Sequence, residues 1–410
     1  MNLHKMLDTT RIPAKPIFVQ RTYGATSSLA YAEIYVAIII LFLFVNPIIV
    51  VFICSLINLR GRISKSWIIP AFFVSLFIAN RSYGVSWQAG EIFGLDDAPT
   101  YLAIYQQLRN AGLVRELFSQ YEPMLLLFYK LLSLINASDY FVLFMSVMLP
   151  ISITFYFITK YTRRPYLFLC IILTLFTGWW NIVFHLFRLS LGYSFIFGAI
   201  ILAHKRKKGV IFNLGASFFS HLSTSFVEVS VLFYTILKKY IEKYYYLFII
   251  LTLVVPSIAL YIIMVNFPEI EKVSYYSNMH YHMYFSNIWI VYICIAAFMI
   301  IAYKGDILGV ISAAMIGSFT LILTGFSVIA ERIILFTTSL LSIPMYFWIE
   351  NKKHMRIVLV FLMLCYFIFR LIKDENSVVA NSVFFYMSNG GYYNLFSGGL
   401  HNLKGLMNII

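Results

Sequence analysis

Residues 209–237 read GVIFNLGASFFSHLSTSFVEVSVLFYTIL and lie between two basic clusters, Lys205–Lys208 and Lys238–Lys243. Short loops rich in lysine and arginine are retained on the cytoplasmic side of a membrane, so we place both clusters there. Two full membrane-spanning helices need roughly 40 residues, whereas this stretch has 29. We therefore expect a re-entrant hairpin, or two short tilted helices, with His221 near the tip. Non-helical backbone at membrane depth is tolerated where it is buried in protein or lines a cavity, which places His221 in a water-accessible cavity.

The composition of the whole chain indicates an integral membrane protein. Its 410 residues are 61% hydrophobic and 12% charged, whereas soluble domains carry about 25% charged residues. Repeated apolar runs of about 20 residues indicate helices and not a barrel. The predicted fold class is therefore all-α, a polytopic membrane protein with about 10–13 membrane helices, a re-entrant hairpin and an outward-facing cavity.

The net charge of +14 does not indicate a nucleic-acid partner, because the basic residues occur in short clusters between apolar runs. That distribution is typical of cytoplasmic loops. The four cysteines lie inside apolar segments without metal-ligand spacing, so we interpret them as small core residues. Further basic clusters expected on the cytoplasmic side are Arg60, Arg62 and Lys65; Lys160, Arg163 and Arg164; and Lys352, Lys353 and Arg356.

We predict one polytopic membrane domain, residues 1–410. Its parts are a polar tail at 1–31, an outward loop at 81–138 with peripheral or partly inserted helices, the hairpin at 209–237 and a second outward loop at 266–286. The segment 122–137 carries Lys130 at its centre and is expected to lie along the outer leaflet without crossing it. Membrane-spanning helices are expected at about 33–57, 67–80, 140–159, 166–184, 186–203, 244–265, 287–303, 307–329, 333–349 and 357–372.

The outward loop contains a long polar and charged stretch that begins at Arg81 and ends at Glu122. Asp97, Tyr101 and Tyr105 recur at i, i+4 and i+8, which would place an acid and two phenols on one helical face. Acids and aromatic rings together suit sugar recognition, because hydroxyls need acceptors and sugar rings need stacking surfaces. The alternative is that Asp96 or Asp97 caps the helix N-terminus and complements its dipole.

Arg188 lies near the outer start of an expected span, on the same helical face as Asn181 and His185. An arginine inside a span usually faces a cavity, a partner or a substrate, and a guanidinium group matches phosphate oxygens in a bidentate manner. The alternative is an interfacial arginine whose side chain reaches the lipid headgroups. We favour an anion-binding role because the neighbouring residues are polar.

His221 is expected to share a helical face with Ser217, Ser225 and Glu228. A neutral imidazole in a cavity can act as a base near neutral pH. The alternative is a hydrogen-bonded core histidine.

Arg81 and Arg332 are interpreted either as topology markers or as phosphate contacts. The predicted topology places Glu122 and His185 on the same outward side.

Several short motifs together resemble the exopolysaccharide and O-antigen polymerases (Wzy-type, EpsG-like). The motifs are RSYG from Arg81, the Asp96–Asp97 pair followed by TYLAIY, YEP ending at Pro123, FRLSL around Arg188, and FFSHLSTSF around His221. The resemblance covers about residues 81–237, with Arg332 as a later match. This chain has Leu189 after Arg188 where members often have glutamine. In the first motif of the family an aspartate closely follows a glycine, whereas the acids of this chain come later, after Gly94 and Leu95.

The resemblance implies a glycosyltransferase of the bacterial inner membrane with its active face on the periplasmic side. Donor and acceptor would both be undecaprenyl-pyrophosphate-linked oligosaccharides held in membrane lipid, with a chain-length regulator as an optional protein partner. Arg188, with Arg81 or Arg332, would neutralise the leaving pyrophosphate, and the base would be His221, Asp96 or Asp97. Tyr101, Tyr105, Glu122 and His185 would contact substrate.

The implied reaction requires no cofactor, no nucleotide sugar and no nucleic acid. A divalent metal ion at the Asp96–Asp97 pair stays an open alternative, although no metal site is predicted. Two alternative functions are another polyprenyl-linked glycosyltransferase or O-antigen ligase, and a lipid-linked oligosaccharide flippase. The flippase is disfavoured because the polar residues gather on one face and no internal repeat is visible.

Overall fold

The computed structural model describes residues 36–41, 47–58, 68–79, 98–111, 123–176, 179, 182–183, 187–221, 224–266, 287–324 and 327–375. Within these ranges every regular element is helical, so the all-α class is confirmed for the part of the chain described. Two helical stretches there, Asp139–Tyr161 and Arg332–Glu350, are long and apolar enough to cross a membrane. The predicted total of about 10–13 membrane helices stays a prediction.

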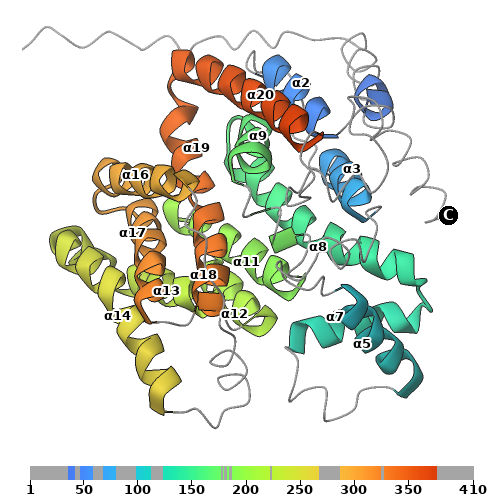
Figure 1. The fold of residues 1–410 in the computed structure, drawn as a ribbon, viewed down its shortest axis with the longest axis horizontal. Helices are drawn as coiled ribbons and strands as arrows, with labels where there is room; N and C mark the ends of the chain where they lie inside the picture. Colours follow the sequence, from blue (N-terminus) through green and yellow to red (C-terminus); the bar gives the residue numbers. More distant parts are fainter. Residues whose placement is uncertain are drawn as a thin grey trace, which may run out of the picture. The chain divides into compact units, whose positions relative to one another are not determined.

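The chain divides after Ile40 into two units, and all helices named below belong to the second. Figure 1 labels them in the order in which they follow one another along the chain. Their bounds are α2 Pro47–Asn58, α3 Ile68–Ala79, α5 Ala98–Ala111, α7 Pro123–Leu134, α8 Asp139–Tyr161, α9 Pro165–Leu175, α11 Phe187–His204, α12 Val210–Ser220, α13 Ser225–Lys243, α14 Tyr245–Asn266, α16 Asn287–Ala302, α17 Ile307–Thr320, the 3-10 helix η2 Leu321–Thr324, α18 Ser327–Leu340, α19 Ser342–Glu350 and α20 Lys353–Glu375.

Two expected spans end earlier than the apolar pattern predicted. α9 ends at Leu175 and not near residue 184, because Phe176 has the non-helical angles φ −111° and ψ 76°. α17 ends at Thr320 and continues as the 3-10 helix η2. The hydroxyls of Ser318 and Thr320 donate to carbonyls three residues earlier, and such local side-chain bonds compete with regular helical hydrogen bonding. Hydrophobicity alone did not reveal either end.

Helix α11 packs between α8 and α12. Its face toward α8 carries the small residues Ser190, Ser194 and Gly198 at four-residue intervals, a spacing that lets helices approach closely. Ser194 Oγ lies 2.8 Å from the carbonyl oxygen of Pro150 in α8 and 3.0 Å from Thr154 Oγ1. A Cβ atom on Gly198 would come within 2.2 Å of the Phe157 ring, so only glycine fits there.

Helix α17 also packs closely against a neighbour, α14, through small residues spaced by four. Gly309, Ala313 and Gly317 are spaced by four residues along α17. A Cβ atom on Gly309 would lie 2.1 Å from the Tyr245 hydroxyl, and one on Gly317 would lie 2.8 Å from a main-chain oxygen of α14. The sequence analysis did not identify this motif, although its spacing is readable in the sequence.

The other side of α14 is a continuous apolar surface. Its large side chains there are between 47% and 58% exposed, which is uncommon for a protein surface in water and expected for one that contacts lipid. These residues are Leu247, Ile250, Leu251, Val254, Val255, Ile258, Ile262 and Val265.

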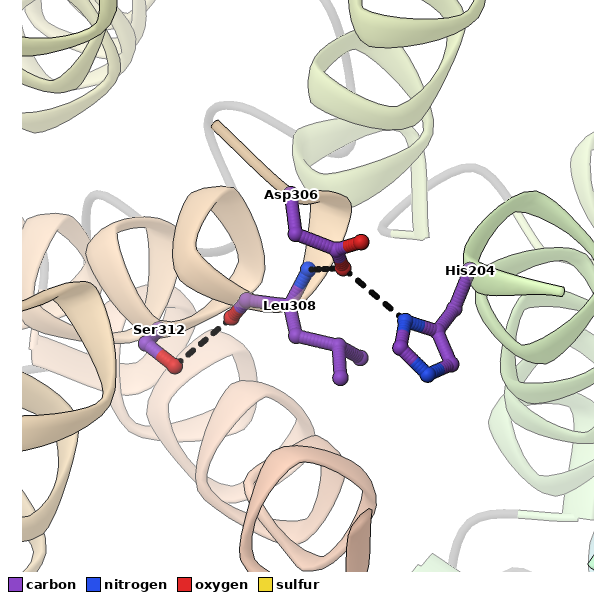
Figure 2. A network of polar contacts seen from close by, with 4 residues as sticks. All are labelled: His204, Asp306, Leu308 and Ser312. Carbon is purple, nitrogen blue, oxygen red and sulfur yellow. Dashed lines mark hydrogen bonds and ion pairs between the residues drawn. The ribbon is translucent and has the colours of Figure 1, made fainter. Parts of the chain in front are cut away.

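A side-chain hydrogen bond joins the C-terminal end of α11 to the start of α17 (Figure 2). His204 Nδ1 lies 3.0 Å from Asp306 Oδ1, and the same carboxylate oxygen accepts the N–H of Leu308 at 3.0 Å, which caps α17. The His204 ring also lies 4.5 Å from the Phe347 ring of α19. These contacts join the loop that precedes α17 to the basic cluster that follows α11.

A second junction joins α9 and α19 through Glu350. Glu350 Oε1 accepts the main-chain N–H of Arg163 at 2.7 Å and the Tyr346 hydroxyl at 2.6 Å. The Tyr346 hydroxyl in turn accepts the N–H of Arg164 at 3.0 Å. Since α9 has no side-chain cap of its own, this distant carboxylate supplies negative charge at its N-terminus. Both junctions connect loops that the positive-inside rule places on the same side of the membrane.

Candidate functional site

The predicted outward segment and the Arg188 helix are in direct contact. Arg188, near the start of α11, donates from Nε to the Tyr101 hydroxyl of α5 at 3.0 Å. The Arg188 Cζ atom also lies 5.9 Å from the centre of the Tyr101 ring. Tyr101 is buried and Arg188 is half-buried, so the tyrosine fixes one edge of a guanidinium group that keeps partial access to the surroundings.

His221 stands at the break between α12 and α13. α12 ends at Ser220, and His221 has extended backbone angles, φ −165° and ψ 124°, while its N–H still donates to the Ser217 carbonyl at 3.0 Å. α13 begins at Ser225 and has a second irregularity at Leu237. The break lies where the length argument expected the tip of the hairpin. Re-entry into a membrane stays a prediction.

Gly192 brings α11 close to this break. A Cβ atom on Gly192 would lie 2.9 Å from Thr224 Cγ2 and 3.5 Å from His221 Cβ. Arg188 precedes Gly192 by four residues, or about 6 Å along a helix axis. Arg188 and His221 therefore belong to the same end of the α11–α12 pair, although no contact between their side chains is described.

Thr224 and Glu228 contact each other at the break, and their positions differ from the predicted arrangement. Thr224 Oγ1 lies 2.6 Å from Glu228 Oε1, and the Glu228 side chain is 6% exposed. The expectation of one continuous helical face from Ser217 through His221 to Ser225 and Glu228 is wrong, because the helix stops at Ser220. The hydroxyl group that binds Glu228 comes from Thr224, which the sequence analysis did not single out.

Arg332 comes from a helix that packs against the same region. Its neighbours Ala330 and Ile333 share an apolar cluster with Phe226 in the first turn of α13. One turn further along α18, the Phe336 ring lies 5.9 Å from the ring of Tyr193, which follows Gly192. We define the candidate site as Tyr101, Arg188, His221 and Arg332, with Thr224 and Glu228 packed behind His221 at the helix break.

Tyr105 lies deeper in the α5–α7 pair than Tyr101. It is fully buried, its hydroxyl donates to the Ala137 carbonyl at 2.6 Å, and its ring lies 6.4 Å from that of Tyr129. Lys130 at the centre of α7 donates to the Leu108 carbonyl at 3.5 Å, which gives the lysine a local partner. The observed contacts of Tyr105 therefore stabilise this helix pair, and its predicted contact with sugar stays a prediction.

The remaining predicted site residues lie outside the described residues. They are Arg81, Asp96, Asp97, Glu122 and His185. Within the described ranges, no group of three or more His, Cys, Asp or Glu side chains could hold a metal ion. Asp96 and Asp97 lie outside those ranges, so the alternative of a divalent ion bound between them stays a prediction.

Comparison with known proteins found no matching family model, no matching curated protein and no matching solved structure. The resemblance to the polymerase family accordingly rests on the short motifs quoted above.

Proposed function

We propose that this protein is a polysaccharide polymerase of the bacterial inner membrane. It would transfer a growing glycan from undecaprenyl pyrophosphate to the non-reducing end of a second lipid-linked repeat unit at the periplasmic face. The observation that carries the proposal is the contact of Arg188 with Tyr101 beside the helix break at His221. It joins three of the motif segments that carry the family resemblance.

The arrangement of charges along α11 supports this orientation. The helix has 18 residues, or about 27 Å, which is close to the ~30 Å thickness of a bilayer core. His204 and the basic residues that follow it stand at one end, and Arg188 stands near the other. If the basic end faces the cytoplasm, Arg188 faces the periplasm.

The lengths of α12 and α13 support a site at membrane depth. α12 has 11 residues, or about 16 Å, which is roughly half of a ~30 Å bilayer core. From Ser225 to the irregular residue Leu237, α13 returns over a similar length. His221 would therefore lie near the middle of the membrane, at the base of a cavity that opens outward.

The chemistry assigned to each residue follows from the charges that change in the reaction. The acceptor hydroxyl oxygen attacks the anomeric carbon of the donor glycan, the bond from that carbon to the pyrophosphate oxygen breaks, and undecaprenyl pyrophosphate leaves. Arg188 would bind the pyrophosphate oxygens and stabilise the charge they gain, with Arg332 as a second cation. His221 would accept the proton of the acceptor hydroxyl and release it to solvent.

Tyr101 would orient the guanidinium group in this scheme. Its hydroxyl accepts from Nε of Arg188, and such a contact limits the orientations that the planar guanidinium group can take toward a phosphate group. Because the donor glycan is already linked to pyrophosphate, which is a good leaving group, the scheme needs no nucleotide sugar. A chain-length regulator stays an optional partner.

The test uses a strain that lacks this gene and is complemented with variants. We expect Arg188→Ala and His221→Ala to abolish long-chain polysaccharide while single capped repeats persist and membrane insertion is normal. Arg109→Ala, which removes an exposed arginine from the end of α5, is the matched control and should give wild-type chain lengths.

The pattern of glycan in the uncomplemented strain separates the alternatives. Single capped repeats support a polymerase. Complete absence of repeats on the outer face supports a flippase or an earlier step. Free polymer that is not transferred to its final lipid supports a ligase. Long polymer in either inactive variant, at wild-type protein level, would remove the role assigned to that residue.

A further inference from the structure

The break between α12 and α13 contains a buried acid whose partners determine its protonation state. Thr224 Oγ1 lies 2.6 Å from Glu228 Oε1 and 2.5 Å from the main-chain oxygen of His221. A threonine hydroxyl has one hydrogen and can donate to one acceptor. A carbonyl oxygen cannot donate. Both contacts are therefore hydrogen bonds only if a protonated Glu228 donates to Thr224 and Thr224 donates to His221.

The surroundings of Glu228 lead to the same protonation state. In the part of the chain that the structure describes, the interactions of the Glu228 carboxyl are with hydroxyl groups and not with a lysine, arginine or histidine. The second hydroxyl beside the carboxyl group, that of Ser217, donates to the Gly192 carbonyl at 2.9 Å. An ionised carboxylate in this position would be buried without a cation and short of donors, which strongly disfavours it.

On the helices near Glu228, the charged and titratable groups in the turns beside the break are Arg188 and Tyr193 on α11, His221 at the end of α12, and Glu331 and Arg332 on α18. His204 stands at the opposite end of α11, and Tyr234 lies further along α13. Arg188 is held at Nε by Tyr101. The groups that contact the Glu228 carboxyl itself are the hydroxyls of Thr224 and Ser217.

We infer that Glu228 is a neutral positioning residue that fixes His221 through Thr224. The chain of hydrogen bonds runs from the Glu228 carboxyl to the Thr224 hydroxyl and from there to the His221 carbonyl. The same carbonyl accepts the Thr224 N–H at 3.2 Å, and the His221 N–H donates to Ser217 at 3.0 Å. Both main-chain groups of His221 are thus held, which satisfies the helix break and orients the imidazole. The inference rests on the proposed function only where it treats His221 as the base.

The decisive substitution is Glu228→Gln. An amide N–H can donate to Thr224 as the protonated carboxyl does, so chain length, the turnover rate and its pH profile should stay at wild-type values. Thr224→Val keeps the methyl group that contacts Gly192 but deletes the hydroxyl, and Glu228→Ala deletes the donor. We expect both to lower the turnover rate about tenfold or more, since each leaves a buried polar group without its partner. The KM for the lipid-linked acceptor should change little.

Two spectroscopic measurements test the inference without an activity assay. Infrared spectra of the purified full-length protein at neutral pH should contain the C=O stretch of a protonated carboxyl, which Glu228→Gln removes. Glu242→Gln, on the exposed side of the same helix, is the matched control and should leave that band. With 15N-labelled histidine, the His221 signal, assigned by its loss in His221→Asn, should stay in place in Glu228→Gln and shift in Thr224→Val.

Loss of activity in a normally inserted Glu228→Gln variant, absence of the protonated-carboxyl band, or an unchanged His221 signal in Thr224→Val would each overturn the inference. Failure of the wild-type gene to restore long polymer would instead contradict the proposed function. In that case the infrared and histidine measurements still decide the state of Glu228.

Discussion

At the scale of single residues, two neighbouring tyrosines on α5 have separate tasks. Tyr101 holds Arg188 through its hydroxyl, and Tyr105 holds the Ala137 carbonyl through its own. The two residues are four positions apart and both rings contact Tyr129. A shared helical face thus serves an electrostatic site at one position and helix packing at the next.

This division predicts different outcomes for the same substitution at the two positions. Tyr101→Phe removes the acceptor for Arg188 Nε but leaves the ring in place, so we expect about a tenfold loss of polymerisation rate with normal stability. Tyr105→Phe should lower the free energy of unfolding by about 1 kcal/mol and leave the rate nearly unchanged. Polymer synthesis in membranes and thermal unfolding in detergent measure the two effects. Equal effects of both variants on rate would contradict the assignment.

Burial raises the pKa of the Tyr105 phenol above its usual value. The phenol is therefore protonated in the folded protein at higher pH than in the unfolded chain, and its hydrogen bond persists at neutral pH. Its contribution to stability is present below about pH 10 and decreases as the pH rises above that value.

At the scale of elements, the helices are joined by residues near their ends. Asp306 caps α17 and pairs with His204 at the end of α11 with one carboxylate oxygen (Figure 2). The Glu350 carboxylate accepts the Arg163 N–H just before α9, a helix whose N-terminus no local side chain caps. Such contacts fix the order of helices at this end of the structure, because each one ties an element to a loop far away in sequence.

We predict graded losses of stability at Asp306. Asp306→Asn keeps a good capping oxygen and should cost less than Asp306→Ala, which removes the cap and the His204 contact together and should cost about 1–2 kcal/mol. Thermal unfolding in detergent measures the difference, with Lys207→Ala as an exposed control in the adjacent loop. Equal stability of Asp306→Ala and wild type would show that the pair contributes nothing.

At the scale of the whole molecule, the fold sorts its polar groups by position along α11. Arg188, His221 and Glu228 belong to one end of the α11–α12 pair, and His204 with its acidic partner belongs to the other. This separation is the one that the proposed topology requires, with the basic loops on the cytoplasmic side and the Arg188 end on the other.

Accessibility of single cysteines tests this arrangement in a background without the native cysteines. Cysteines that replace the exposed Lys207 and Lys304 should react with a membrane-impermeant maleimide only in inverted vesicles. A cysteine at Arg109 on α5 should react in intact spheroplasts. Reaction of positions 109 and 207 from the same side would contradict the predicted topology.

The sequence by itself determined the helical class, the bounds of most long helices and the position of the break at His221. Composition and the spacing of basic clusters carry that information, because a bilayer fixes how many residues a crossing requires. Local pattern did not determine where α9 and α17 end, since backbone angles and hydroxyl bonds interrupt apolar runs there.

Only the tertiary structure decided which residues meet. Tyr101 and Arg188 are 87 positions apart, His204 and Asp306 are 102 apart, and Arg163 and Glu350 are 187 apart. Thr224 and Glu228 are close in sequence, but the break that contains Thr224 packs against α11 at Gly192, where a Cβ atom would lie 2.9 Å from Thr224 Cγ2. Pair contacts of this kind depend on how helices pack, and packing depends on the whole set of side chains that share an interface.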